Sequence, residues 1–123
     1  MHRVLIVDDE SVIADTLGLI FTKHGFDTKV VYCADDALAC AREFSPNLLL
    51  CDINMPGRSG WELLGDFSRE FPDCRVLILT GYQSNPARVE EQSQKHRHPV
   101  RLIAKPCTPV ELLREAGQML ASV

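Results

Sequence analysis

The sequence lacks the features that assign a chain to the membrane or to nucleic acid. None of its apolar runs approaches the roughly 20 residues that a membrane-spanning helix needs. The first run, Val4–Val7, is ended by two acids, which is not the pattern of a signal peptide. Basic residues do not dominate either, because 13 Lys and Arg stand against 17 Asp and Glu, a net charge of −4. This balance argues against nucleic-acid binding by this chain alone. We therefore expect a cytoplasmic protein without membrane association.

The cysteines also lack a disulfide pattern. They are odd in number and form no CxxC pair: Cys33, Cys40, Cys51, Cys74 and Cys107. This pattern indicates reduced thiols of a cytosolic protein, most of them filling the core. A redox role is the alternative, with Cys107 as its first candidate.

The composition is that of one globular domain. The 123 residues are 46% hydrophobic and 24% charged, with no internal repeat, low-complexity tract or linker. A chain of this length is expected to fold as a single domain, residues 1–123, with a core large enough to need no covalent staple.

Five short apolar runs predict five strands, at residues 4–7, 29–32, 48–51, 76–79 and 100–104. Runs that are nearly continuous in apolar residues are typical of strands buried on both faces of a sheet. The second run, which the pattern allows to begin at Phe26, contains Asp27 and Lys29 and is predicted to lie at the sheet edge.

Helical periodicity occupies the stretches between and after these runs. It predicts helices over 12–21, 34–44, 59–70, 85–95 and 108–120. Gly25 follows the first as a C′ residue, and Thr108 opens the last as a capping box with Glu111. Trp61 is predicted to lie in the core. The fourth helix, Asn85–Lys95, has few apolar residues and is expected to be mobile or completed by a partner.

Alternating strands and helices with short connections predict an α/β fold. Right-handed crossovers then give a parallel sheet with helices on both of its faces. In such a sheet, ligands bind at the carboxyl ends of the strands. The residues at or just beyond these ends are Asp8, Asp9, Asp52, Thr80 and Lys105.

The three acids at this edge predict a metal site. A single Asp at a strand end is often only a helix cap, but three that converge repel one another. At about 5 Å and an effective dielectric near 20, each pair costs roughly 3 kcal/mol, which a cation or a raised pKa must offset. Carboxylate ligands in a half-open site suit Mg²⁺ better than Ca²⁺.

The remaining polar residues point to phosphoryl chemistry. A hydroxyl at Thr80 and an ammonium at Lys105 suit the oxygens of a phosphoryl group. Asp52 follows a fully apolar run, so it is rigidly held and is the candidate nucleophile that forms an aspartyl phosphate. The turn over residues 53–57 can present a backbone carbonyl as a further metal ligand.

Four motifs in this order resemble the receiver domains of response regulators in two-component signalling: Val7-Asp8-Asp9-Glu10, Asp52-Ile53-Asn54-Met55-Pro56-Gly57, Thr80-Gly81 and Lys105-Pro106. The resemblance runs essentially end to end and implies a doubly wound, flavodoxin-like sheet of order 2-1-3-4-5. It implies that Asp52 accepts a phosphoryl group from the phosphohistidine of a histidine kinase. It further implies Mg²⁺ held by Asp8, Asp9, Asp52 and the Asn54 backbone carbonyl, phosphoryl oxygens bound by Thr80 and Lys105, and a cis Lys105–Pro106 peptide.

Two positions depart from the pattern of that family. Leu102 stands where an aromatic residue usually takes part in activation, and Cys107 stands where Phe is common. The resemblance implies that phosphorylation switches the face formed by the fourth helix, fifth strand and fifth helix for protein contacts. Leu102 puts the usual form of that switch in question.

The resemblance leaves several functions to weigh. The chain is expected to catalyse its own phosphorylation and dephosphorylation without being a turnover enzyme. Its partners would be a histidine kinase or phosphotransfer protein and a downstream protein target, a fused output domain or a second copy. It also fits a receiver module cut from a hybrid kinase or a transcriptional regulator. A Mg²⁺-dependent phosphatase is disfavoured, because Asn54 stands where a second acid would serve. A phosphorylation-independent binding module is disfavoured because the acids and the lysine are all present.

Overall fold

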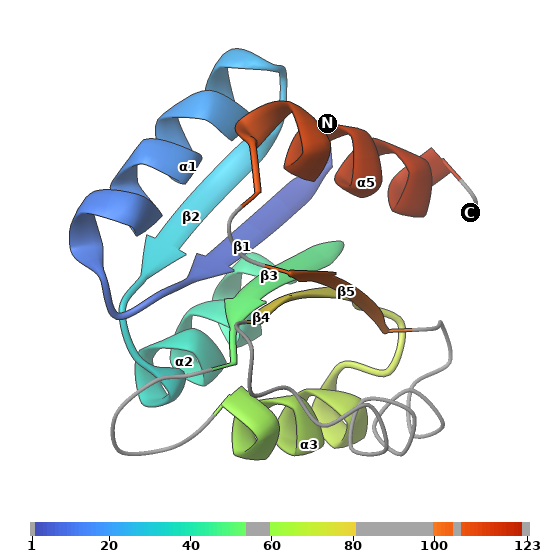
Figure 1. Cartoon of the computed structure of the whole chain (residues 1–123). Helices are drawn as coiled ribbons and strands as arrows, with labels where there is room; N and C mark the ends of the chain where they lie inside the picture. The colour runs from blue at the N-terminus through green and yellow to red at the C-terminus, as the bar shows by residue number, and fades with distance from the viewer. Residues whose placement is uncertain (1, 54–59, 81–99, 105–106, 122–123) are drawn as a thin grey trace.

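Five parallel strands form one sheet in the computed structural model, which describes residues 2–53, 60–80, 100–104 and 107–121. They are β1 (Arg3–Val7), β2 (Asp27–Val31), β3 (Leu48–Asp52), β4 (Arg75–Thr80) and β5 (Arg101–Ala104). Their order is β2-β1-β3-β4-β5, with β3 in the middle (Figure 1). Both the predicted sheet order and the predicted edge position of the second strand are confirmed. Each strand begins and ends within two residues of its predicted bounds.

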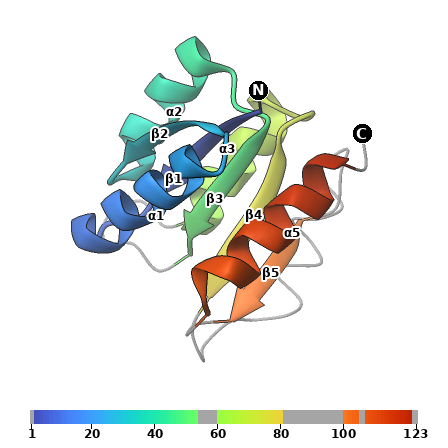
Figure 2. The same ribbon diagram turned by 90° about the horizontal axis from the view of Figure 1, so that it is seen from above.

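Helices cover both faces of this sheet, as predicted. The described residues contain α1 (Ser11–Lys23), α2 (Ala34–Phe44), α3 (Gly60–Glu70) and α5 (Pro109–Ala121). Figures 1 and 2 show α1 and α5 on one face of the sheet and α2 and α3 on the other. The predicted helix at 85–95 lies outside the described residues.

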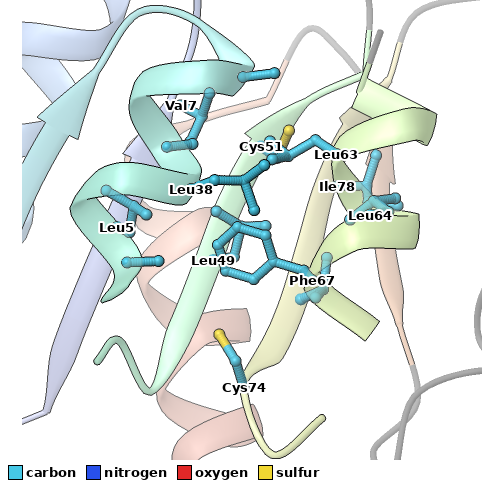
Figure 3. Packing of buried hydrophobic residues seen from close by; sticks show 14 of the residues in the cluster. Leu5, Val7, Leu38, Leu49, Cys51, Leu63, Leu64, Phe67, Cys74 and Ile78 are labelled. Atoms are coloured by element: carbon cyan, nitrogen blue, oxygen red, sulfur yellow. The ribbon is translucent and has the colours of Figure 1, made fainter. Parts of the chain in front are cut away.

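Two apolar clusters, one on each face, explain why the central strands are continuous apolar runs. Alternate residues of β1, β3 and β4 point to opposite faces. Leu5, Leu49 and Ile78 pack under α2 and α3, where Leu38, Leu64 and Phe67 meet them (Figure 3). Their sequence neighbours, among them Ile6, Leu50 and Leu77, join α1 and α5 on the other face. A strand buried on both faces needs apolar side chains at every position.

The fifth strand is the exception that the sequence did not predict. Its residues Arg101, Leu102 and Ala104 are exposed, and the Leu102 side chain is 41% accessible. The prediction of burial on both faces is therefore wrong for β5. The reason is its position, because β5 pairs with β4 and forms the second edge of the sheet within the described residues.

Two helix ends follow the predicted signals, and a third has a left-handed residue that no signal predicted. The Thr108 backbone N–H donates to the Glu111 carboxylate at 3.3 Å, and the Glu111 N–H donates to the Thr108 hydroxyl at 3.2 Å, which confirms the capping box. Gly25 follows α1 with φ of 91°, the left-handed conformation predicted for a C′ glycine. Ser45 ends α2 with φ of 51° although it is not a glycine.

The cysteines are free thiols, as predicted, and most of them are in or against the core. Cys51 and Cys74 are buried, Cys40 and Cys107 are partly buried against the two apolar clusters, and Cys33 is exposed. Trp61 is also partly buried against the cluster beneath α2 and α3. Among the described helices, none combines the length and apolar character needed to span a bilayer.

Candidate functional site

The carboxyl ends of β1 and β3 bring three aspartates together. These two strands are parallel neighbours, and Val7 is in register with Cys51. Asp8 and Asp52, the next residues along each chain segment, therefore lie side by side. Asp9 follows on the short connection to α1. One carboxylate oxygen from each of the three residues lies within 4.8 Å of the others.

The cluster is buried on one side and open on the other. Asp8 is 1% and Asp52 3% exposed, whereas Asp9 is exposed to solvent. An ion in this position would thus contact protein oxygens on one side and keep water on the other. The sequence prediction of a half-open site is consistent with this arrangement.

Hydrogen bonds fix the backbone around the two buried acids. The Asp8 N–H donates to the Val31 carbonyl at 3.3 Å, which extends the pairing of β1 and β2 by one residue. The Asp8 carboxylate accepts the Glu10 N–H at 2.9 Å just before α1 begins. On β3, the Ile53 N–H donates to the Leu79 carbonyl at 3.1 Å, directly after Asp52. The acids are therefore held in place by neighbouring backbone.

Charge repulsion makes this edge a site that could hold a cation. At separations of up to 4.8 Å, two carboxylates repel by about 3 kcal/mol in a medium of effective dielectric near 20. Mg²⁺ binds oxygens at about 2.0–2.1 Å, which places its ligand atoms roughly 3 to 4 Å apart. Three carboxylate oxygens in this spacing fit such an ion after a small closure.

Cys51 lies immediately beside the acids and stays neutral. Burial raises the pKa of its thiol well above the ordinary value, and the charges of Asp52 and Asp8 raise it further. The thiol donates to the Asp52 backbone carbonyl, with sulfur and oxygen 3.3 Å apart. A thiolate here would add a fourth negative charge to the cluster, so the neutral form is the one compatible with the site.

Thr80 reaches the same edge from the next strand. Asp52 is in register with Leu79, which places Thr80 one residue further toward the carboxyl end, and Thr80 is buried. Thr80 is itself in register with Ala104, the residue before Lys105. Lys105 and Asn54 lie outside the described residues, so their roles stay predictions.

Two features of the site were missed by the sequence reasoning. The bond from the Glu10 N–H to the Asp8 carboxylate joins residues two apart, and an Asp two residues before a helix N-cap is a recognisable signal for it. The second is a bond from the Tyr32 hydroxyl to the Asp15 carboxylate, at 2.5 Å, beside the loop that carries Asp9. No sequence pattern signals a contact between two exposed residues 17 positions apart.

Comparison with known proteins decides the family. The sequence profile of the response regulator receiver domain matches residues 4–116. The chain belongs to this family. Receiver domains are the signalling modules of two-component systems and in general bind Mg²⁺, and the three-aspartate cluster is a site that could hold it.

Solved receiver structures share the fold over nearly the whole chain. A CheY-like receiver domain protein from Methanospirillum hungatei JF-1 is 29% identical, with a TM-score of 0.88 over 99% of this chain and 95% of that one. The receiver domain of NtrX from Brucella abortus is 27% identical, with a TM-score of 0.83 over 98% of this chain and 99% of that one.

A longer NtrX structure shows the same domain within a larger protein. It is 27% identical to this chain, with a TM-score of 0.85 over 99% of this chain. The chain spans only 28% of that protein's length. In the longer NtrX structure, a similar receiver domain is thus one part of a longer polypeptide.

Proposed function

We propose that this receiver domain accepts a phosphoryl group on Asp52 from the phosphohistidine of a histidine kinase or phosphotransfer protein, in a Mg²⁺-dependent reaction. The observation that carries the proposal is the buried Asp52 carboxylate, which stands with Asp8 and Asp9 within 4.8 Å at the carboxyl edge of the sheet. A lone aspartate at a strand end is often only a helix cap. Three together form a site for a cation and for the charged group that it accompanies.

The reaction is a displacement at phosphorus. A carboxylate oxygen of Asp52 attacks the phosphorus atom, the bond from phosphorus to the histidine nitrogen breaks, and the imidazole leaves. The Thr80 hydroxyl donates to one phosphoryl oxygen and the Lys105 ammonium neutralises another. Asp8, Asp9, Asp52 and the Asn54 backbone carbonyl would hold Mg²⁺, which would supply charge neutralisation at the phosphoryl oxygens. Hydrolysis of the aspartyl phosphate then resets the domain, so the chain acts once per signal and is not a turnover enzyme.

The phosphorylated domain signals through a protein contact. We place the responsive surface on β5 and α5 together with the predicted fourth helix, and Leu102 lies on this surface because its side chain is 41% exposed on β5. The contact partner is a separate protein, a second copy or a fused output domain. The fused arrangement is supported by the NtrX comparison, in which this domain is a minor part of a longer chain. Such signalling belongs in the cytoplasm.

The test is the intact mass of the protein after incubation with Mg²⁺ and acetyl phosphate. The parent chain is expected to gain one phosphoryl group, and Asp52→Asn is expected to gain none. Asp36→Asn is the matched control, since it removes an exposed aspartate from the first turn of α2 and should behave as the parent. Chelation of the metal should abolish the gain.

Two results would contradict the proposal. If the parent gained no mass while a known receiver was modified in the same mixture, the domain would not be a phosphoacceptor. If Asp52→Asn were modified as fully as the parent, the acceptor would be another residue.

A further inference from the structure

The first turn of α1 directly follows the metal-binding loop, residues 8–10, but buries little of its own surface. Its residues Ser11, Val12 and Ile13 are exposed, and the Val12 side chain is 78% accessible. Ala14 is the first buried residue of the helix. The N-cap residue Glu10 makes no side-chain capping bond. The packing that holds most helices in place is therefore weak at the end that adjoins Asp9.

The middle of the same helix is held differently. A Cβ atom added to Gly18 would lie 2.6 Å from a Val30 methyl carbon, so this glycine lets α1 approach β2 closely. Leu17 and Phe21 are buried at the same level. Around these contacts, α1 and β2 leave a surface hollow of about 320 Å³, lined by Asp15, Gly18, Leu19, Thr22, Thr28 and Val30. Close packing secures the helix here, but it does not extend to the first turn.

A hydrogen bond links the second turn of α1 to the residue that follows β2. The Tyr32 hydroxyl donates to the Asp15 carboxylate at 2.5 Å. Tyr32 directly follows Val31, whose carbonyl accepts the Asp8 N–H at 3.3 Å. The end of β2 thus contacts both sides of the metal-binding loop, with Asp8 bound through Val31 and α1 bound through Tyr32. Asp9 stands between these two attachments.

Asp9 is the ligand whose position needs this support. Asp8 and Asp52 are buried and held by backbone hydrogen bonds, whereas Asp9 is exposed. Repulsion among three carboxylates within 4.8 Å displaces the least constrained of them first. Asp9 adjoins the first turn of α1, so a shift of that turn would carry Asp9 with it. The bond between Tyr32 and Asp15, one turn further along the helix, resists such a shift.

We propose that Tyr32 and Asp15 form a brace that positions Asp9 for metal binding. Both are positioning residues, since neither belongs to the cluster of metal-binding oxygens. This inference rests on the proposed function, because it assigns a role toward the same metal site. The hydrogen bond to Asp15 also raises the pKa of Tyr32 above its ordinary value. The hydroxyl therefore remains a donor at neutral pH.

The test is Mn²⁺ affinity, measured from the electron paramagnetic resonance signal of the free ion, with Mn²⁺ as the probe for the divalent site. Tyr32→Phe keeps the ring and removes the hydroxyl. Loss of one surface hydrogen bond to a carboxylate should raise the Mn²⁺ dissociation constant about threefold to tenfold. In a background that already carries Asp15→Ala, the same change should have no further effect, because the brace is already broken.

Glu70→Gln is the matched control. Glu70 accepts two hydrogen bonds from Arg42, at 2.6 and 2.9 Å, which link α2 and α3. Weakening that contact is expected to leave the Mn²⁺ dissociation constant unchanged. It is expected to shift thermal unfolding without metal by an amount similar to the shift caused by Tyr32→Phe. The comparison separates a specific effect on the metal site from a general loosening of the fold.

The outcomes distinguish the brace from the proposed function. Normal Mn²⁺ binding by both the parent and Tyr32→Phe would overturn the brace and leave the proposed function standing. The same would follow if Tyr32→Phe weakened binding equally with and without Asp15, or if Glu70→Gln weakened it as much. An absence of Mn²⁺ binding by the parent would overturn the metal-dependent part of the proposed function and the brace with it.

Discussion

The two ends of the central strands use polar residues in opposite ways. At the amino ends, the Arg3 N–H donates to the Asn47 side-chain oxygen and the Asn47 N–H donates to the Arg3 carbonyl, both at 2.8 Å. The Arg75 N–H donates to the Asn47 carbonyl at 3.0 Å, so Asn47 joins three strands. At the carboxyl ends, Asp8 and Asp52 are buried beside a third carboxylate.

This difference assigns a stabilising role to the amino ends and, under the proposed function, a binding role to the carboxyl ends. Hydrogen bonds between uncharged groups at the amino ends lower the free energy of the folded chain. Like charges at the carboxyl ends raise it and are offset when a cation binds. Removing a polar group at the amino ends should therefore lower the free energy of unfolding without metal. Removing a charge at the carboxyl ends should leave that free energy the same or raise it.

The largest expected effect is a loss of metal affinity at the carboxyl ends of the strands. Asp8→Asn removes one negative charge and retains an oxygen that can accept the Glu10 N–H. Changes in groups that only support metal ligands cost about 10- to 100-fold in affinity, so loss of a ligand charge should cost on the order of 100-fold or more. Calorimetric titration with Mg²⁺ measures this loss of affinity. The free energy of unfolding without metal should stay the same or rise, because repulsion falls.

A large loss of metal-free stability in Asp8→Asn would contradict the contrast between the two ends. It would mean that the Asp8 charge stabilises the fold itself. Ser11→Ala, an exposed change in the adjacent first turn of α1, is the control for a general perturbation of that helix.

The second prediction concerns the hydrogen bonds at the amino ends of the strands. Asn47→Ala removes the acceptor of the Arg3 N–H and should lower the free energy of unfolding by about 1–3 kcal/mol, since a partly buried donor loses its partner. Urea denaturation measures the loss. Metal affinity should not change, because Asn47 lies at the other end of β3 from Asp52. A weakened metal site in this variant would show that the two ends are coupled.

The third prediction sharpens the comparison within α1. Gly18→Ala places a methyl group 2.6 Å from a Val30 methyl carbon, so one of the two elements must shift. Overpacking costs typically 1–3 kcal/mol, and the better helix propensity of Ala returns up to about 1 kcal/mol. We expect thermal denaturation to show a net loss of roughly 1–2 kcal/mol. An unchanged or raised melting temperature would mean that α1 and β2 separate easily.

The smallest effect concerns the thiols. Burial raises the pKa of Cys74 to about 12 and raises that of Cys51 further, so both thiols are protonated and inaccessible in the native chain. Cys33 is exposed and should react first with a thiol reagent near pH 8. Cys33→Ser should remove the fast phase of that reaction. Rapid modification of Cys51 or Cys74 without denaturant would show that the core opens locally.

The same pKa shifts predict a direction for alkaline stability. A thiol whose pKa is higher in the folded chain than in the unfolded chain stabilises the fold fully below about pH 9, the ordinary value. That contribution is lost as the pH rises from about 9 toward 12, because the unfolded chain releases the proton first. Cys74→Ser should make the measured loss of stability over this range shallower. An identical slope in both chains would contradict the shift.

Much of the fold was predictable because its signals are local. Continuous apolar runs identified β1, β3 and β4, and the threonine and glycine signals placed the start of α5 and the end of α1. The sheet order was different, since it followed from the resemblance to receiver domains and not from the periodicity. The exposure of β5 was not predicted, because an apolar run of four or five residues looks the same in a central and an edge strand.

The sequence by itself determined which residues reach the carboxyl edge, since strand ends are set by local pattern and parallel strands share a direction. Only the tertiary structure decided that Asp8, Asp9 and Asp52 come within 4.8 Å, that Cys51 stays neutral beside them, and that Tyr32 bonds to Asp15. These facts depend on the register of β1 against β2 and β3 and on how closely α1 approaches the sheet. Such distances arise from packing between segments far apart in the chain, which no local pattern encodes.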